Sequence, residues 1–91
     1  MEKELKEDEG RLLRADGFDH CIMGLGRQAN QFSIVYDEDK VIDTLCDRDG
    51  MSLDDAREYY EFNIAGAYVG NGTPTFVRIM GFESITELTE E

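Results

Sequence analysis

Fifteen consecutive residues without a charge, residues 63–77, set the strongest constraint on how this chain can fold. They read NIAGAYVGNGTPTFV, in a chain of which 33% of the residues are charged. A run of this length suits a crossing of the hydrophobic core, because charged side chains are almost never fully buried unless they are paired. Its glycine-rich middle, from Gly70 to Pro74, breaks a helix and indicates a turn. We therefore expect the run to contain a helix end, a turn and a strand.

The helix that enters this run, residues 51–68, has the clearest signals in the sequence. Ser52 is a preferred N-cap residue, and Asp55 stands three positions later, as in a short capping box. Tyr59 and Phe62 lie beside the apolar stripe, so the helix is covered on two sides or faces a partner there. The stripe at helical spacing, which we expect to be buried, consists of Leu53, Ala56, Tyr60, Ile64 and Ala67.

Two apolar runs upstream, residues 20–26 and 32–36, flank a polar loop and predict a β-hairpin. Because the first run is apolar on both faces, we expect it to be the central strand. Residues 37–50 then predict a helix, with Asp37 as the N-cap and Gly50 just after the last turn.

The predicted fold class is α+β. We expect a small three-stranded, mainly antiparallel sheet with two helices packed on one face, a ββααβ core whose third strand lies in residues 75–80. A short C-terminal helix, capped by Ser84, would dock through Phe82, Ile85 and Leu88.

The length of 91 residues predicts one domain. We place it at residues 16–88, after an acidic N-terminal arm or frayed helix over residues 1–15 and before a frayed tail over residues 89–91.

The charge balance excludes several partners. Twenty-one Asp and Glu residues against nine Lys and Arg residues give a formal net charge of -12, which repels phosphate groups. We therefore predict no direct binding to nucleic acid or to an anionic membrane, and either a basic protein partner or simple solubility. With no signal peptide, no apolar run near the ~18 residues of a membrane span, and two cysteines, Cys21 and Cys46, the chain is expected to be cytosolic with reduced thiols.

The short motifs do not predict a cofactor, a metal or an enzyme. The GLGRQA stretch, residues 24–29, is followed by a strand where a dinucleotide site needs a helix. When Gly50 is aligned with the glycine of a calcium loop, Leu45 and Ala56 take the two strongest ligand positions. His20 and Cys21 are neighbours on an expected strand, so they point to opposite faces and cannot pair.

An alternative function remains open at this stage. Asn63 lies beside the apolar stripe, where a buried amide needs hydrogen-bond partners, and we expect it to tie the helix end to the following turn. The same residue, together with His20 and the turn from Gly70 to Pro74, would also suit the pocket of a small enzyme or ligand-binding domain.

Four motifs carry a resemblance to a known group of proteins. They are DGFD at residues 16–19, YD followed by a lysine at residues 36–40, DGMS at residues 49–52, and FN…GAY.G..TP at residues 62–74. In these motifs the chain resembles a family of small proteins encoded by tailed bacteriophages, with Asp55 where a glutamate is more usual. The family brings no assigned activity and no catalytic residue; the resemblance implies a viral protein that works in the host cytoplasm.

The function expected from these observations is a non-enzymatic phage accessory protein that binds a host or phage protein. It would act as an inhibitor or as a mimic of nucleic acid, and a homodimer is also compatible with the sequence. Aromatic residues dominate interface hot spots, and the residues predicted to bind the partner are Tyr59, Phe62, Tyr68 and Phe76.

Overall fold

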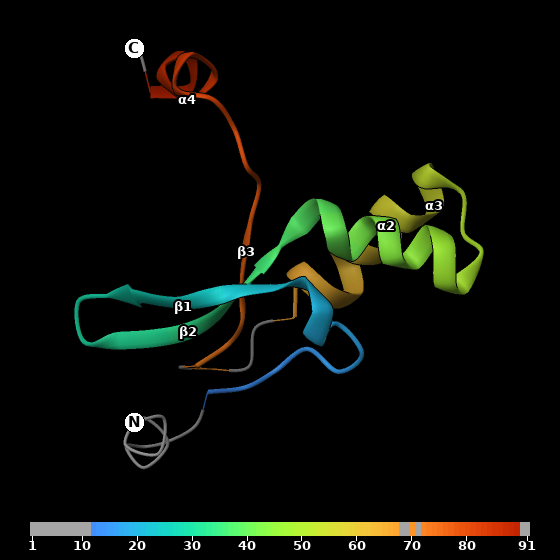
Figure 1. The fold of residues 1–91 in the computed structure, drawn as a ribbon, viewed down its shortest axis with the longest axis horizontal. Helices are drawn as coiled ribbons and strands as arrows, with labels where there is room; N and C mark the ends of the chain where they lie inside the picture. Colours follow the sequence, from blue (N-terminus) through green and yellow to red (C-terminus); the bar gives the residue numbers. More distant parts are fainter. Residues whose placement is uncertain (1–11, 68–69, 71, 90–91) are drawn as a thin grey trace.

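The described part of the chain forms a three-stranded sheet and three α-helices, which confirms the expected α+β class and the C-terminal helix (Figure 1). The computed structural model describes residues 12–67, 70 and 72–89. The elements are a 3₁₀ turn η1 (Asp19–Cys21), β1 (Ile22–Gln28), β2 (Gln31–Asp37), α2 (Glu38–Asp49), α3 (Leu53–Tyr59), the π-helix η2 (Tyr60–Ala65), β3 (Thr75–Val77) and α4 (Phe82–Thr89).

The order of the strands is β1-β2-β3, so β2 is central and the expectation that residues 20–26 form the central strand is wrong. β1 pairs with β2 in the antiparallel sense over six residue pairs, and β3 pairs with β2 in the parallel sense over three. β1 is an edge strand whose apolar side chains Ile22, Met23 and Leu25 are exposed. Its apolar character on both faces therefore reflects uncovered surface and not burial between neighbours.

Local capping explains where the two central helices begin. The Asp37 carboxylate accepts hydrogen bonds from the N–H groups of Asp39 and Lys40 at 3.0 and 3.3 Å, and α2 starts at Glu38, directly after this cap. Gly50 then adopts φ 71°, a left-handed conformation that glycine adopts without strain, and ends α2. Ser52 Oγ accepts from the Asp55 N–H at 3.1 Å and starts α3. These three capping predictions are confirmed.

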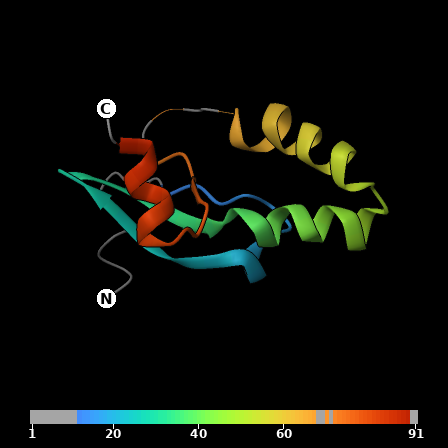
Figure 2. The same ribbon diagram turned by 90° about the horizontal axis from the view of Figure 1, so that it is seen from above.

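The hydrophobic core lies where the hairpin meets the helix pair. Figure 2 shows α3 and η2 running back alongside α2 on one side of the molecule, while the β1–β2 hairpin extends to the other side. The helices surround the carboxyl end of β2, where Tyr36 stacks on Phe76 at 5.4 Å between ring centroids, and they do not spread over the length of the hairpin. The buried residues are Phe18, Cys21, Tyr36, Val41, Ile42, Leu45, Ala56 and Tyr60.

The second helix changes type in its middle. Ala56 and Tyr60 are buried as expected, but Ile64 is only partly buried, and Leu53 and Ala67 are exposed. A π-helix bonds residue i to i+5 instead of i+4, so residues four positions apart no longer share one line after Tyr60. The expectation that Ile64 is fully buried is therefore wrong, and the cause is this wider turn.

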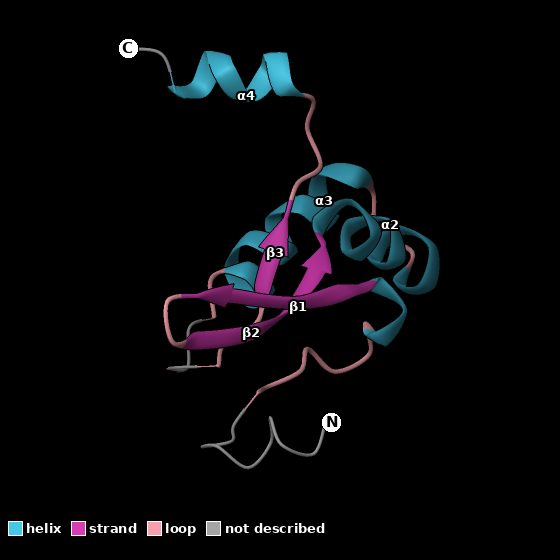
Figure 3. Cartoon of the chain, turned by 60° about the vertical axis from the view of Figure 1, so that its left-hand side comes forward, coloured by secondary structure: helices cyan, strands magenta, loops and turns pink. Residues whose placement is uncertain are grey.

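The C-terminal helix stands away from the rest of the chain. An extended segment after β3 leads to α4, which lies clear of the sheet and the helix pair (Figures 1 and 3). The helix starts at Phe82, since the Ile85 N–H bonds the Gly81 carbonyl at 3.1 Å, so Ser84 lies inside the helix and is not its cap. None of the described residues 82–89 is buried, and the expected docking through Phe82, Ile85 and Leu88 is not seen in the structure.

Candidate partner-binding site

A groove of about 490 Å³ lies between the segment before η1, the end of α2, and the second helix. Its apolar floor includes Phe18 and Leu45 from the core, and Ile64 from η2. Tyr59 and Asn63 stand on its helical side. The groove therefore opens beside the helix that the sequence singled out for partner binding.

Arg48, near the end of α2, fixes the segment that lines one side of the groove. Its Nη1 donates to the Gly17 carbonyl at 2.9 Å, and its guanidinium lies 5.0 Å from the centre of the Phe18 ring. Nε and Nη2 donate to the two carboxylate oxygens of Asp49 at 3.1 and 3.3 Å, and this hydrogen bonding raises the pKa of Arg48. Arg48 thus keeps its charge and fixes the segment before η1 against the end of α2.

The segment before η1 is also fixed by two backbone N–H groups of its own. The Ala15 N–H donates to the Tyr36 hydroxyl at 2.7 Å, and the Leu13 N–H donates to the Gly72 carbonyl at 3.1 Å. Residues 13–15, the last part of the expected N-terminal arm, are therefore hydrogen-bonded to the domain and help to line the groove.

Two of the four predicted partner-binding residues lie on the surface of the second helix. Phe62 is 74% exposed and Tyr59, three residues earlier, is 43% exposed; of these two, Tyr59 lines the groove. Phe76 is partly buried: it packs against the core, where it stacks on Tyr36 and meets the edge of the Tyr60 ring at 5.6 Å between centroids, and it also lines the groove. Tyr68 lies outside the described residues. The structure thus brings Tyr59 and Phe76 to the groove and leaves Phe62 exposed on the second helix.

The residues of the alternative pocket are separated in the structure. His20 Nε2 lies 2.8 Å from Thr44 Oγ1 on α2, in a shallow depression of its own. Asn63 is exposed and lines the groove, so the expectation of a buried amide is wrong; the π-helix carries it outside the stripe. His20 and Asn63 therefore do not form one site.

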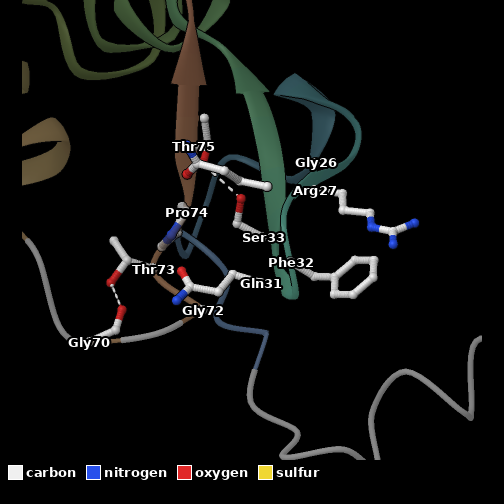
Figure 4. A pocket seen from close by; sticks show the side chains of 11 residues that line it. Gly26, Arg27, Gln31, Phe32, Ser33, Gly70, Gly72, Thr73, Pro74 and Thr75 are labelled. Carbon is white, nitrogen blue, oxygen red and sulfur yellow. Dashed lines mark hydrogen bonds between the residues drawn. The ribbon is translucent and has the colours of Figure 1, made fainter.

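The turn from Gly70 to Pro74 borders a third hollow, of about 400 Å³, against the hairpin (Figure 4). Thr73 Oγ1 donates to the Gly70 carbonyl at 2.6 Å, and Gly70 has φ 105°, which closes the turn. Ser33 and Thr75 join β2 to β3 through a hydroxyl pair at 2.7 Å. Only Pro74 is shared between this hollow and the groove beside Asn63.

Sequence reasoning missed a polar cluster of Glu38, Tyr60 and Arg78, in which Tyr60 is buried, Glu38 is partly buried and Arg78 is exposed. The Tyr60 O–H donates to Glu38 Oε1 at 3.1 Å, and Arg78 Nη2 and Nε donate to Glu38 Oε2 at 2.9 and 3.1 Å. Burial, and then the charge of Glu38, raise the pKa of Tyr60, so its phenol stays protonated. The cluster joins α2, η2 and the end of β3 and offers no nucleophile. The only signal in the sequence was Glu38 at the helix start, where the helix dipole already explains it.

The two cysteines do not form a reactive pair in the structure. Cys21 and Cys46 are free, and burial raises the pKa of the Cys21 thiol, which disfavours the reactive thiolate. Within the part of the chain that the structure describes, no group of three His, Cys, Asp or Glu residues could hold a metal ion. The described helices include none long and apolar enough to cross a membrane.

Comparison with known proteins found no matching family model, no matching curated protein and no matching solved structure.

Proposed function

We propose that this chain is a non-enzymatic phage accessory protein that binds another protein, of the host or of the phage, in the host cytoplasm. The observation that carries the proposal is two exposed aromatic side chains on the second helix: Tyr59, which lines an apolar groove, and Phe62, three residues further along. Exposed aromatic groups next to a hollow that can take an apolar side chain are typical of the anchoring points of protein interfaces.

The charges around this pair define the partner's chemistry. Glu58 and Glu61 are exposed on the same helix, on either side of Tyr59 and Tyr60 in the sequence. A partner that inserts an apolar side chain into the groove and presents Lys or Arg around it would match both features, and long-range attraction would speed the association.

Inhibition by mimicry of nucleic acid is one form of this proposal. Asp39, Asp43 and Asp47 are exposed and lie four residues apart on α2. One side of that helix therefore carries carboxylates at steps of ~6 Å, which can stand in for a row of phosphates. A nucleic acid that competes with this protein for the captured partner would support this form.

The test is capture of a partner by the tagged full-length chain from host lysate, repeated with Phe62→Ala. We expect the variant to lose the captured protein, because truncation of an interface anchor costs about 2 kcal/mol or more. Phe82→Ala is the matched control, since Phe82 is an exposed phenylalanine on α4, outside the proposed surface. Capture lost with Phe82→Ala and kept with Phe62→Ala would contradict the proposed surface.

The second candidate is a small enzyme or ligand-binding domain that uses the groove with Asn63 at its rim. The observation in its favour is the volume of about 490 Å³, inside the ~300–1,000 Å³ range of small-molecule sites. If the chain captures no protein at low or physiological salt, this candidate gains weight. A rise in melting temperature with one nucleotide or divalent metal, abolished by Asn63→Ala, would then identify the groove as its site.

A further inference from the structure

Helix α4 exposes an apolar side that no described residue of its own chain buries. Phe82, Ile85 and Leu88 lie on one side at helical spacing and are 81%, 44% and 72% exposed. Isolated helices shorter than about 12–15 residues are marginal in water, and most helical stability comes from packing of an apolar face. The eight residues of α4 therefore need a surface to pack on.

The same chain has an uncovered apolar surface on its hairpin. Leu25 lies opposite Ile34, and Ile22 opposite Tyr36, so their side chains share one face of the sheet. The register shifts between Ile22 and Gly24, which places Met23 at the irregularity. We call the three exposed residues Ile22, Met23 and Leu25 the hairpin patch. Ile34, which packs against the core, connects this patch to the interior.

The charges of α4 and of the hairpin are complementary. α4 contains Glu83 and Glu87 and no basic residue. In an otherwise acidic chain, residues 21–36 contain a single charge, Arg27, which is positive. Arg27 stands over the Phe32 ring at 5.6 Å, and Figure 4 shows both side chains pointing away from the turn that contains Gly70. The hairpin is thus the part of this molecule least repulsive to an acidic helix.

We propose that α4 of one copy packs on the hairpin patch of a second copy, and that the exchange is mutual in a two-fold dimer. The Arg78–Glu38 ion pair, 2.9 Å, anchors the chain just before the linker to α4. From that point the linker leads α4 away from its own sheet (Figure 3). A closed two-fold exchange covers both surfaces of both copies and makes the small contact twice. This dimer uses neither Tyr59 nor Phe62, so it stands independently of the proposed function.

Because of the net charge, salt should affect this dimer in the opposite way from a complex with a basic protein. Two copies, each with a formal charge of -12, repel each other at long range, and salt screens this repulsion. The dimer should therefore tighten as salt rises, whereas association with a basic protein weakens.

The experiment is sedimentation equilibrium of the full-length chain at about 0.05 M and about 0.5 M NaCl. We expect a dimer with a lower dissociation constant at the higher salt. The double variant Phe82→Ser/Leu88→Ser, and separately Leu25→Ser, should each raise the dissociation constant at least about tenfold, because each removes apolar surface from the contact. Phe62→Ser is the matched control and should leave it unchanged.

The α4 variants keep the test decisive, because α4 packs on no part of the core and circular dichroism can confirm that they fold. A monomer at both salt concentrations, including one in which α4 closes on its own hairpin, would overturn the proposal. A dimer that depends on Phe82 and Leu88 but not on Leu25 would mean that two α4 helices pair with each other. A dimer lost only with Phe62→Ser would place self-association on the second helix.

Discussion

A single hydroxyl at Tyr60 connects three elements that are far apart in the sequence. It bonds Glu38 at the start of α2, and Glu38 in turn holds Arg78 after β3. Removal of this hydroxyl leaves the ring packed against Phe76 and leaves Glu38 with Arg78 as its partner.

We expect Tyr60→Phe to lower the free energy of unfolding by about 1.5 kcal/mol near neutral pH, as for a hydrogen bond to a charged group. The loss should depend on pH. The pKa of Tyr60 is higher in the folded state than in the unfolded state, where it is about 10. The stabilisation by the protonated hydroxyl is therefore complete below about pH 10, and it is lost as the pH rises through the pKa of the folded state. Urea unfolding at about pH 8 and about pH 11 should show the difference between wild type and variant narrowing at the higher pH.

Tyr59→Phe is the control, since that ring is partly exposed and its change should cost less than about 0.5 kcal/mol. A difference between wild type and Tyr60→Phe that stays constant from about pH 8 to about pH 11 would show that Tyr60 does not titrate as argued.

Residues that act on their near neighbours were predictable from the sequence, and residues that depend on tertiary contacts were not. Helices are capped by Ser52, Asp37 and Gly50 as expected, because a cap involves only residues a few positions away in the sequence. Phe76 was expected at a partner surface and is partly buried against the core at the edge of the groove, whereas Asn63 was expected to be buried and is exposed. Their positions follow from the parallel pairing of β3 and from the π-helix, neither of which has a local signal in this sequence.

At the scale of the element, Gly66 allows the π-helix to end. A Cβ atom built at Gly66 would lie 2.6 Å from the carbonyl oxygen of Glu61, five residues earlier. That distance is too short for real atoms, and the backbone oxygen cannot swing away as a side chain can. The wide turn from Tyr60 to Ala65 and the glycine after it therefore depend on each other.

We expect Gly66→Ala to lower the free energy of unfolding by about 1–3 kcal/mol, as overpacking does, or to convert the turn to a regular helix. Urea unfolding measures the first outcome, and the NMR chemical shifts of Phe62 and Asn63 report the second. Gly24→Ala is the control, since a Cβ there meets nothing within 4 Å. Equal stability and unchanged shifts for Gly66→Ala would contradict the π-helix.

The elements themselves illustrate which patterns are sufficient for prediction. Existence and type followed from periodicity and caps, as for α2 and the second helix. The place of a strand in the sheet could not be predicted in this way. An exposed edge strand and a buried central strand can have the same apolar composition, as β1 shows. The position of α4 could not be predicted either, since its amphipathic pattern predicts that one side is covered but not what covers it.

For the whole molecule, net charge and size together set how stability responds to salt. The principal extents are 39 × 38 × 21 Å, comparable to the Debye length of ~30 Å at about 0.01 M salt and far above the ~8 Å at about 0.15 M. At the lower ionic strength each carboxylate repels most of the others, which destabilises the compact state.

We therefore expect the urea midpoint to rise between about 0.01 M and about 0.15 M NaCl. The measurement belongs on the Phe82→Ser/Leu88→Ser chain, so that dimer formation does not contribute. The same series at about pH 4, where many carboxylates are protonated, should show a smaller rise. A midpoint that falls with salt, or a rise of equal size at both pH values, would show that self-repulsion does not limit stability.

Charge is distributed unevenly between the helix pair and the hairpin. The acidic helices α2 and α3 lie to one side and the hairpin, with Arg27 as its only charge between residues 21 and 36, extends to the other (Figure 2). A positively charged surface would therefore attract the helix pair more strongly than the hairpin itself. A basic protein would meet the same end first. The orientation of capture would then leave the hairpin free for a second copy.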